Sequence, residues 1–254
     1  MEIDDLFART LEGDYDDDAP WEAVWSLHRM GTREVFEYAS SWIKSSRPLK
    51  RARGFDIVAQ LGRTVDHPSN SFPQQAYDLV STALQEEREF LPRRSAISAL
   101  GHLDDPRAVP LIALFSSDPS AEIRFAVACA LGVFPNDPLS IETLTAMTED
   151  EDGDVRDWAT FGVGVLGDWD SAELRDALFR RMDDSDADAR EEAVVGLAKR
   201  RDGRVLPTLI ELLTKPEVGS RPVEAACLLL GMADEPEDWS AQAYADALRQ
   251  RFGP

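Results

Sequence analysis

The sequence of 254 residues contains little histidine, little cysteine and no long apolar run. With three histidines and two cysteines, neither a histidine-rich metal centre nor a disulfide framework is expected. No apolar stretch reaches the roughly 20 residues that a membrane-spanning helix needs. The first residues, Met1–Asp5, include neither the basic region nor the apolar core of a signal peptide, so we expect a cytoplasmic protein.

Sequence signatures of catalysis are also missing. There is no Gly-x-Ser-x-Gly nucleophile motif, and Cys129 and Cys227 lie in apolar segments where buried, reduced thiols are expected. The glycines of residues 162–167 follow no strand, so they indicate close helix packing rather than a dinucleotide site. The acidic residues 148–154 lack the first aspartate and the final glutamate of a calcium loop. We therefore expect no catalytic residue, no cofactor and no bound metal.

Positive charge is scarce as well, because 27 Lys and Arg face 48 Asp and Glu, for a net charge of −21. Such a charge repels phosphate backbones and anionic membranes and attracts basic proteins. We therefore expect a basic protein partner and neither a nucleic acid nor a membrane; surface acidity that serves solubility alone is the alternative. The one basic stretch is expected to be a solvated turn or a local partner contact, and it consists of Lys44, Arg47, Lys50, Arg51 and Arg53.

What the sequence does contain is a repeat. An eight-residue step from the start of an apolar stretch to a glycine-like residue recurs along the chain, most clearly from Arg93 to Gly101, Arg124 to Gly132 and Arg156 to Gly164. The landmark residues, 34, 39, 31, 32, 34 and 33 positions apart, are His28, Gly62, Gly101, Gly132, Gly164, Ala198 and Gly231. A period of this length is typical of stacked-repeat proteins.

Each repeat has the pattern of two helices separated by a break. Apolar residues recur at helical spacing on both sides of Asp105-Pro106 and Asp137-Pro138, where the aspartate can cap the second helix and the proline suits its first turn. Asp170 and Glu173 have the spacing of a capping box at the corresponding break. Strand-like alternation is absent, so the predicted class is all-α, a solenoid of about seven two-helix repeats.

Two polar positions repeat with the apolar ones and are interpreted as structural ladders between neighbouring repeats. Arginine stands eight residues before the landmark at Arg93, Arg124, Arg156 and Arg190. Acidic or amide residues stand four residues after it at Asp66, Asp105, Asn136, Asp168, Asp202 and Glu235.

These landmarks and ladders resemble the HEAT-repeat family, in the short bacterial form also found in phycobilisome lyase-type proteins. The tetratricopeptide and ankyrin signatures are missing. The resemblance implies a right-handed α-solenoid, and we expect it to span residues 20–254 as a single domain. Residues 1–19 are acidic and are predicted to be either a tail or a short capping helix.

The tryptophans supply the candidate binding residues. Trp158 stands where other repeats have small or polar residues, and Trp169 lies in a turn, so both are candidate exposed anchors, with packing between adjacent repeats as the alternative. Trp21 and Trp25 are predicted to be core. The acidic residues expected to accompany the candidate anchors are Asp150, Asp152, Asp157 and Asp184.

The function favoured by this sequence is a non-enzymatic, monomeric scaffold, adaptor or inhibitor that binds a basic protein. A sharper version is an immunity-type inhibitor of a basic toxin. The enzyme alternatives that the resemblance offers are a phycobilin lyase-like protein, which would carry a tetrapyrrole, and a HEAT-fold DNA glycosylase, which would need a basic face.

Overall fold

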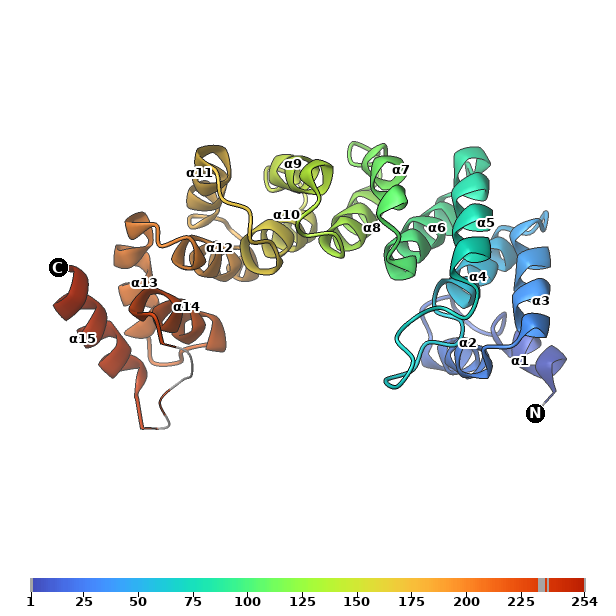
Figure 1. The fold of residues 1–254 in the computed structure, drawn as a ribbon, viewed down its shortest axis with the longest axis horizontal. Coiled ribbons are helices and arrows are strands. Elements are labelled where there is room, and N and C mark those ends of the chain that lie inside the picture. The colour runs from blue at the N-terminus through green and yellow to red at the C-terminus, as the bar shows by residue number, and fades with distance from the viewer. Residues whose placement is uncertain (1, 233–235, 237, 254) are drawn as a thin grey trace. The chain divides into compact units, whose positions relative to one another are not determined.

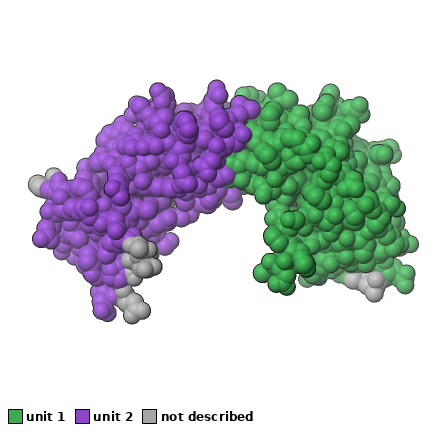
Figure 2. All heavy atoms as spheres, in the orientation of Figure 1, with its two compact units in different colours: residues 1–134 green, residues 135–254 purple. Residues whose placement is uncertain are grey.

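The structure is a computed structural model that describes residues 2–232, 236 and 238–253. Within these residues it contains helices and no strand, as predicted. The chain forms two compact units, residues 1–134 and residues 135–254 (Figure 2). Each unit consists of consecutive helix pairs that pack side by side (Figure 1). The prediction that the solenoid is continuous from residue 20 to residue 254 stays a prediction.

The helices of the first unit begin with α1 (Ile3–Arg9), which precedes the pairs. They continue with α2 (Asp18–Met30), α3 (Arg33–Ile43), α4 (Pro48–Ala59), α5 (Pro73–Glu86), α6 (Phe90–Leu103), the short η1 (Pro106–Ala108), α7 (Val109–Ala113) and α8 (Ala121–Gly132). The second unit contains α9 (Pro138–Met147), α10 (Gly153–Phe161), the π-helix η2 (Gly162–Leu166), α11 (Ala172–Arg181), α12 (Ala187–Lys199), η3 (Gly203–Val205), α13 (Leu206–Leu213), α14 (Ser220–Leu230) and α15 (Ala241–Phe252). Among the described residues, α2 to α7 make three pairs in the first unit and α10 to α15 make three in the second, whereas the predicted pair of α8 and α9 is divided between the units.

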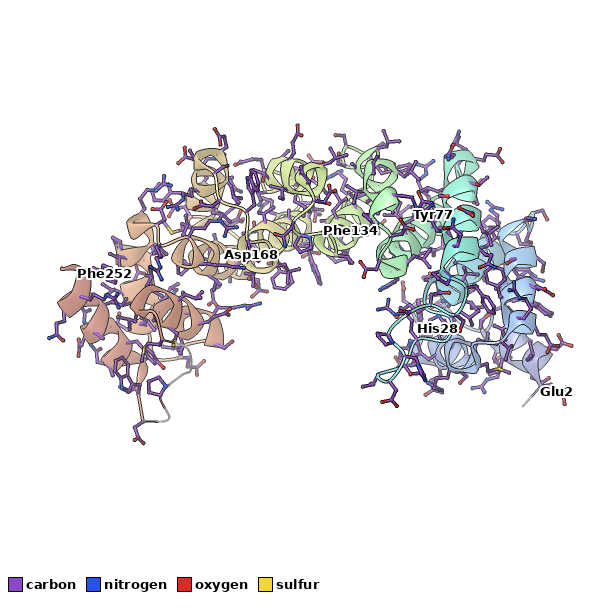
Figure 3. The ribbon with its side chains drawn as sticks, viewed as in Figure 1. Glu2, His28, Tyr77, Phe134, Asp168 and Phe252 are labelled. Atoms are coloured by element: carbon purple, nitrogen blue, oxygen red, sulfur yellow. The ribbon has the colours of Figure 1, made fainter. Side chains whose placement is uncertain are left out.

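The landmark position marks where the first helices of neighbouring repeats approach closely. A Cβ atom on Gly101 of α6 would lie 2.9 Å from the Cα of Ala130 on α8, so only glycine fits there. In the second unit Gly196 of α12 takes the same role, because its Cβ would lie 2.8 Å from the Cα of Gly164. At the first landmark the residue is histidine rather than glycine. His28 is buried, and its Nε2 lies 2.9 Å from the carbonyl oxygen of Asp56 (Figure 3).

Residues 1–19 contain a capping helix. Phe7 of α1 is fully buried, and its ring stacks on Tyr38 at 4.0 Å and meets the edge of Trp42 at 4.9 Å. Arg53 holds the following turn, because its guanidinium donates hydrogen bonds to the carbonyl oxygens of Thr10 and Tyr15.

The basic stretch is therefore not a solvated turn throughout. Arg53 is 0% exposed, lies inside α4 and forms an ion pair with Asp56. Arg51 is paired with the buried carboxylate of Glu87 at 2.6 Å. Two of the five basic side chains are thus paired within the fold; Arg53 is enclosed, whereas the side chain of Arg51 remains 16% exposed.

The arginine ladder holds α6, α8, α10 and α12 to the turns before them, and Arg93 and Arg156 also reach the next turn. Arg124, Arg156 and Arg190 each donate to the carbonyl oxygen six residues earlier, at 2.9, 2.9 and 2.6 Å. Arg93 also reaches Asp118 at 3.2 Å, and Arg156 reaches Asp184 at 2.8 Å. Such charge-assisted bonds fix the register between neighbouring repeats.

The second ladder mixes caps and cross-links. Asp105 and Asp202 accept hydrogen bonds from backbone N–H groups at helix starts, whereas Asn136 accepts one from the backbone of Asp168 in the next repeat. Asp137, which follows the ladder position, caps α9 as predicted. The predicted capping box is wrong by one residue. Ser171 is the N-cap of α11, and Asp170 pairs with Arg175 instead. Glu235 of the predicted ladder lies outside the described residues.

Candidate binding surface

Residues 135–254 carry most of the excess negative charge, with 27 Asp and Glu against 13 Lys and Arg, compared with 21 against 14 in residues 1–134. Most of their basic side chains are already engaged in ion pairs within the unit. The pairs join Arg156 to Asp184, Arg175 to Asp170, Arg180 and Arg181 to Glu149, Lys199 to Asp168, Arg204 to Asp176 and Arg221 to Glu224. The carboxylates that remain therefore give this unit its negative surface.

The loop that carries Trp169 begins at the π-helix. Residues 162–166 extend α10 by one wide turn, which closes where the N–H of Gly167 donates to the carbonyl oxygen of Gly162 at 3.0 Å. Such turns leave carbonyl groups without their α-helical partners and are frequent at functional sites. A Cβ atom at Gly167 would lie 2.9 Å from the carbonyl oxygen of Pro135, so the loop also passes close to the preceding repeat.

Arg200 satisfies those carbonyl groups. Its side chain is buried, with the residue 7% exposed, and donates to the carbonyl oxygens of Val163, Gly164, Gly167 and Trp169 at 2.7–3.2 Å. Lys199 adds bonds to Val165 and Gly167. The backbone of an exposed tryptophan is thus fixed by cations from the next repeat, and its side chain is 54% exposed.

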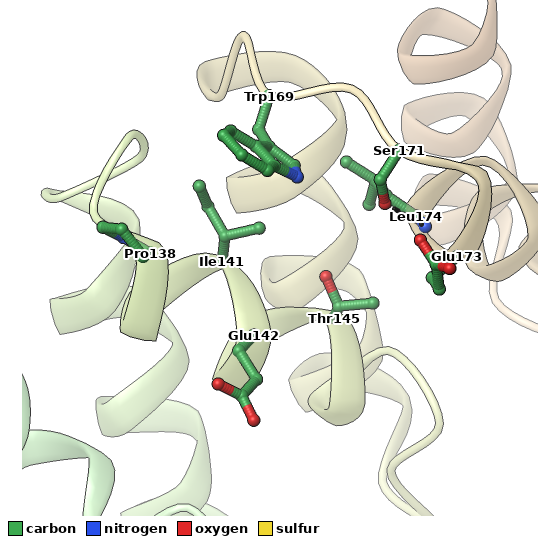
Figure 4. A pocket seen from close by; sticks show the side chains of 8 residues that line it. All are labelled: Pro138, Ile141, Glu142, Thr145, Trp169, Ser171, Glu173 and Leu174. Carbon is green, nitrogen blue, oxygen red and sulfur yellow. Dashed lines mark hydrogen bonds between the residues drawn. The ribbon is translucent and has the colours of Figure 1, made fainter.

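A hollow of about 310 Å³ lies beneath this tryptophan, between α9 and α11. Figure 4 shows Trp169 at one end with its indole toward Ile141, and carboxylates contributed by both helices. The residues that line the hollow are Pro138, Ile141, Glu142, Thr145, Trp169, Ser171, Glu173 and Leu174. Among the described residues that line it there are two carboxylates and no basic side chain.

Glu173 is held in its charged form. It lies in the first turn of α11, and its own backbone N–H and the Ser171 hydroxyl lower the pKa of the carboxyl group. Carboxylates are favoured in this position because helix N-termini carry a partial positive charge. The hollow therefore combines an aromatic face with fixed negative charge.

Trp158 is exposed in the other layer of helices, as predicted. It lies on α10, is 40% exposed and meets the ring of Phe161 edge to face, with centroids 5.8 Å apart. Arg221 of α14 covers the same Phe161 ring at 5.5 Å. In Figure 1, α9 and α11 form one layer of this unit and α10 and α12 the other; Trp158 belongs to α10, whereas Trp169 lies in the loop before α11.

Beside Trp158 lies a group of crowded carboxylates, Asp157, Glu192 and Glu224. Arg221 binds Glu192 at 3.0 Å and Glu224 at 2.9 Å. Burial and the neighbouring aspartates raise the pKa of Asp157 to about 6, and burial raises the pKa of Glu192 to about 7 despite the arginine. The second oxygen of Glu192, Oε2, is buried without a hydrogen-bond partner. Asp157 and Glu192 therefore gain their charge near neutral pH.

The remaining predicted residues, Asp150, Asp152 and Asp184, lie in turns, and the first two are half-buried. Asp152 caps α10 through the N–H of Val155, and Asp150 accepts from the N–H of Asp152. The assignment of Asp184 to the contact surface needs correction, because its side chain is 1% exposed and its oxygens accept bonds from Arg156 and Arg181. Its pKa is held far below the usual range, chiefly by the bond from Arg156.

Sequence reasoning misplaced residues in both units. In residues 1–134, Trp25 is 49% exposed and not core, and Cys129 is half-buried, although Cys227 of the second unit is buried as expected. Glu142 and Glu173 carried no repeat signal, because nothing along the chain indicates that α9 and α11 leave a hollow. A second hollow, of about 810 Å³ in residues 1–134, is lined by side chains of both signs, among them Lys44, Arg51, Asp78, Glu86 and Glu89.

No group of three or more His, Cys, Asp or Glu side chains among the described residues is arranged to hold a metal ion. No helix among them has the length and apolar character to span a bilayer.

Paired helices in series, joined by arginine and aspartate ladders, define this chain as an α-solenoid protein. The family model for HEAT repeats matches residues 77–164 and 161–231, more than half of the chain, and the chain belongs to the HEAT-repeat family. Protein YibA of Escherichia coli (strain K12) is 35% identical over 206 residues, which cover 79% of this chain and 71% of YibA.

Solved structures share the fold. The X-ray structure of Escherichia coli YibA matches with a TM-score of 0.76 at 22% identity, over 98% of this chain and 93% of that one. The complex of CpcE and CpcF of phycocyanin lyase from Nostoc sp. PCC7120 matches with a TM-score of 0.51 at 16% identity, over 98% and 95% of the two chains.

Proposed function

We propose that this protein is a non-enzymatic interaction module that binds a basic partner protein through the acidic surface of residues 135–254. The observation that carries the proposal is the pairing of excess charge with exposed aromatic side chains in one unit. Trp158 and Trp169 are both exposed there, amid 27 acidic and 13 basic residues. Aromatic anchors surrounded by charge are the usual composition of a binding hot spot.

The proposed contact residues are Trp158 and Asp157 on α10, Trp169 before α11, and the turn residues Asp150 and Asp152. Negative potential attracts a basic partner and raises its association rate, an effect that salt screens within about 8 Å at physiological ionic strength. The tryptophans then supply contacts that persist after the charges are screened. We further propose that the protein acts in the cytoplasm and as a monomer.

The test is a pull-down with the full chain at low salt, eluted by a rising salt gradient, with identification by mass spectrometry. The proposal expects a stoichiometric basic protein that elutes as salt increases. A second chain in which Trp158 and Trp169 are both replaced by alanine is the matched bait, and it should lose that protein. Equal capture by both baits would mean that charge alone retains the protein, and the proposed surface would be wrong.

The enzyme alternative is tested with the same preparation. The likeness to the phycocyanin lyase complex concerns the fold, and a lyase-like chain would retain a chromophore. We expect the visible absorption spectrum of the purified protein to show no tetrapyrrole band. A stoichiometric chromophore would overturn the non-enzymatic proposal, and a basic nuclease in the salt eluate would narrow it to an inhibitor.

A further inference from the structure

The hollow between α9 and α11 has the composition of a slot for one cationic side chain. Its apolar floor is formed by Pro138, Ile141 and Leu174, and Trp169 closes one end (Figure 4). Its volume of about 310 Å³ lies at the lower end of the range of roughly 300–1,000 Å³ seen for ligand sites. A space of this size suits a single long side chain better than a folded segment.

The charges around the hollow are all of one sign. Glu142 lies on α9 and Glu173 on α11, and both are exposed. The nearby Arg175 does not neutralise them, because it is bound to Asp170 at 2.6 Å, and Lys199 is bound to Asp168 at 2.8 Å. Cations are attracted to the face of an indole within about 6 Å, and this attraction adds to that of the carboxylates.

The aromatic wall is fixed before any partner arrives. Arg200 binds the carbonyl oxygen of Trp169, and Asn136 binds the N–H of Asp168, so the loop is held from both neighbouring repeats. The corresponding position in other repeats, five after the landmark, is occupied by residues without a large apolar side chain, which are His67, Pro106, Asp137, Gly203 and Pro236. Trp169 therefore makes this hollow different from the rest of the repeat array.

We propose that this hollow accepts one arginine side chain of the partner, with its guanidinium against the Trp169 indole and attracted by the negative charges of Glu142 and Glu173. Arginine fits better than lysine, because a planar guanidinium stacks on an aromatic ring and presents its N–H donors in a fixed plane. The inference rests on the proposed function and names the chemical group that the partner must present.

The experiment titrates the full, ¹⁵N-labelled chain with the capped tripeptide Gly-Arg-Gly and, in parallel, with its uncharged analogue Gly-citrulline-Gly. The indole N–H signal of Trp169, assigned with the Trp169→Phe variant, is followed by NMR. We expect a saturable shift with the arginine peptide, with a Kd of about 1–10 mM, and no saturable shift with the citrulline peptide. The indole of Trp25, equally exposed in the other unit, is the internal control.

Two carboxylate variants complete the test. Glu142→Gln with Glu173→Gln should weaken the arginine peptide at least about fivefold, whereas Glu211→Gln, an exposed carboxylate on α13, should not. Equal binding of the citrulline peptide, or equal shifts at Trp25, would overturn the arginine slot. If the double variant still captured the basic partner at full strength while Trp158→Ala did not, the slot would be wrong and the proposed function would stand. If the full chain captured no basic protein, the proposed function would be wrong, whatever the result with the arginine peptide.

Discussion

Arg200 and Trp169 belong to successive repeats, and the Nε of the arginine donates to the carbonyl oxygen of the tryptophan at 2.8 Å. The guanidinium is buried while the indole is exposed. Arg200 thus fixes the backbone at residue 169, and Trp169 exposes its side chain from that fixed backbone. Buried charges of this kind are tolerated because several hydrogen bonds compensate for the lost hydration.

Removing that guanidinium should destabilise the protein strongly. Arg200→Ala leaves the buried carbonyl groups of Val163, Gly164 and Gly167 without their donor, which should lower the free energy of unfolding by about 3 kcal/mol or more. Urea denaturation followed by circular dichroism measures this loss. Arg180→Ala, which removes an exposed pair with Glu149, is the control and should cost less than about 1 kcal/mol. Equal losses would mean that the Arg200 bonds add little.

Trp158 should matter for binding and not for folding. Trp158→Ala should weaken the partner complex by roughly 2 kcal/mol or more, because exposed aromatic anchors carry much of an interface's affinity. Titration calorimetry with the captured partner measures this change. Trp25→Ala, a similarly exposed residue of the other unit, should leave affinity unchanged. A fall in unfolding free energy of about 3 kcal/mol for Trp158→Ala would instead identify it as core.

The Asp157 and Glu192 carboxyl groups should make stability decline as pH rises. Their pKa values are raised to about 6 and about 7 in the folded state, so the folded protein binds more protons than the unfolded chain between about pH 4 and 7. The stabilisation is complete below about pH 4 and is lost as pH rises through 7. Glu192→Gln should flatten this decline by about 1–3 kcal/mol, measured as unfolding free energy at pH 4.5 and pH 8.

Asp184 should show the opposite sign. Arg156 holds the folded-state pKa of this aspartate far below its usual value, so its stabilisation is present above about pH 4 and is lost as pH falls. Asp184→Asn should therefore destabilise the protein at pH 7 and matter much less near pH 2. Arg156→Ala should cost about 3–5 kcal/mol at pH 7, since it leaves a buried carboxylate without its main partner. If the unfolding free energy of Asp184→Asn depended on pH as that of the unmodified protein does, the ion pair between Arg156 and Asp184 would not stabilise the fold.

The close approach of Gly196 to Gly164 should tolerate no added methyl group. Gly196→Ala places a Cβ 2.8 Å from a backbone carbon, so α12 and η2 must separate, at a cost of about 1–3 kcal/mol. Gly203→Ala is the matched control, because nothing lies within 4 Å of the Cβ it would add. Thermal unfolding should show a lower Tm for the first variant alone.

The repeat predicted the fold because helix pairs of fixed length leave a period in the sequence. Arg156 and Asp137 were correctly interpreted as ladder and cap, since both act on neighbours at constant spacing. Trp158 and Trp169 were correctly predicted to be exposed, because they break the repeat pattern at surface positions.

The roles of residues that depend on partners far away in the chain could not be predicted from the sequence. Arg53 looks like part of a solvated basic stretch until α1 and its following turn cover it. Trp25 was predicted to be core because it lies on an apolar helical face, yet the residue is 49% exposed. Glu142 and Glu173 line one hollow only because α9 and α11 pack side by side with a space between them, which no pattern within one helix encodes.

The π-helix at residues 162–166 ties the position of Trp169 to backbone length as well as to side chains. A helix advances about 100° with each residue, so removing one residue from this wide turn would restore α-helical pitch and swing the following loop by about that angle. The indole would then leave the hollow although Trp169, Glu142 and Glu173 were all still present. In this repeat, recognition would therefore be gained or lost through the insertion of a single amino acid, without any change in the residues that make contact.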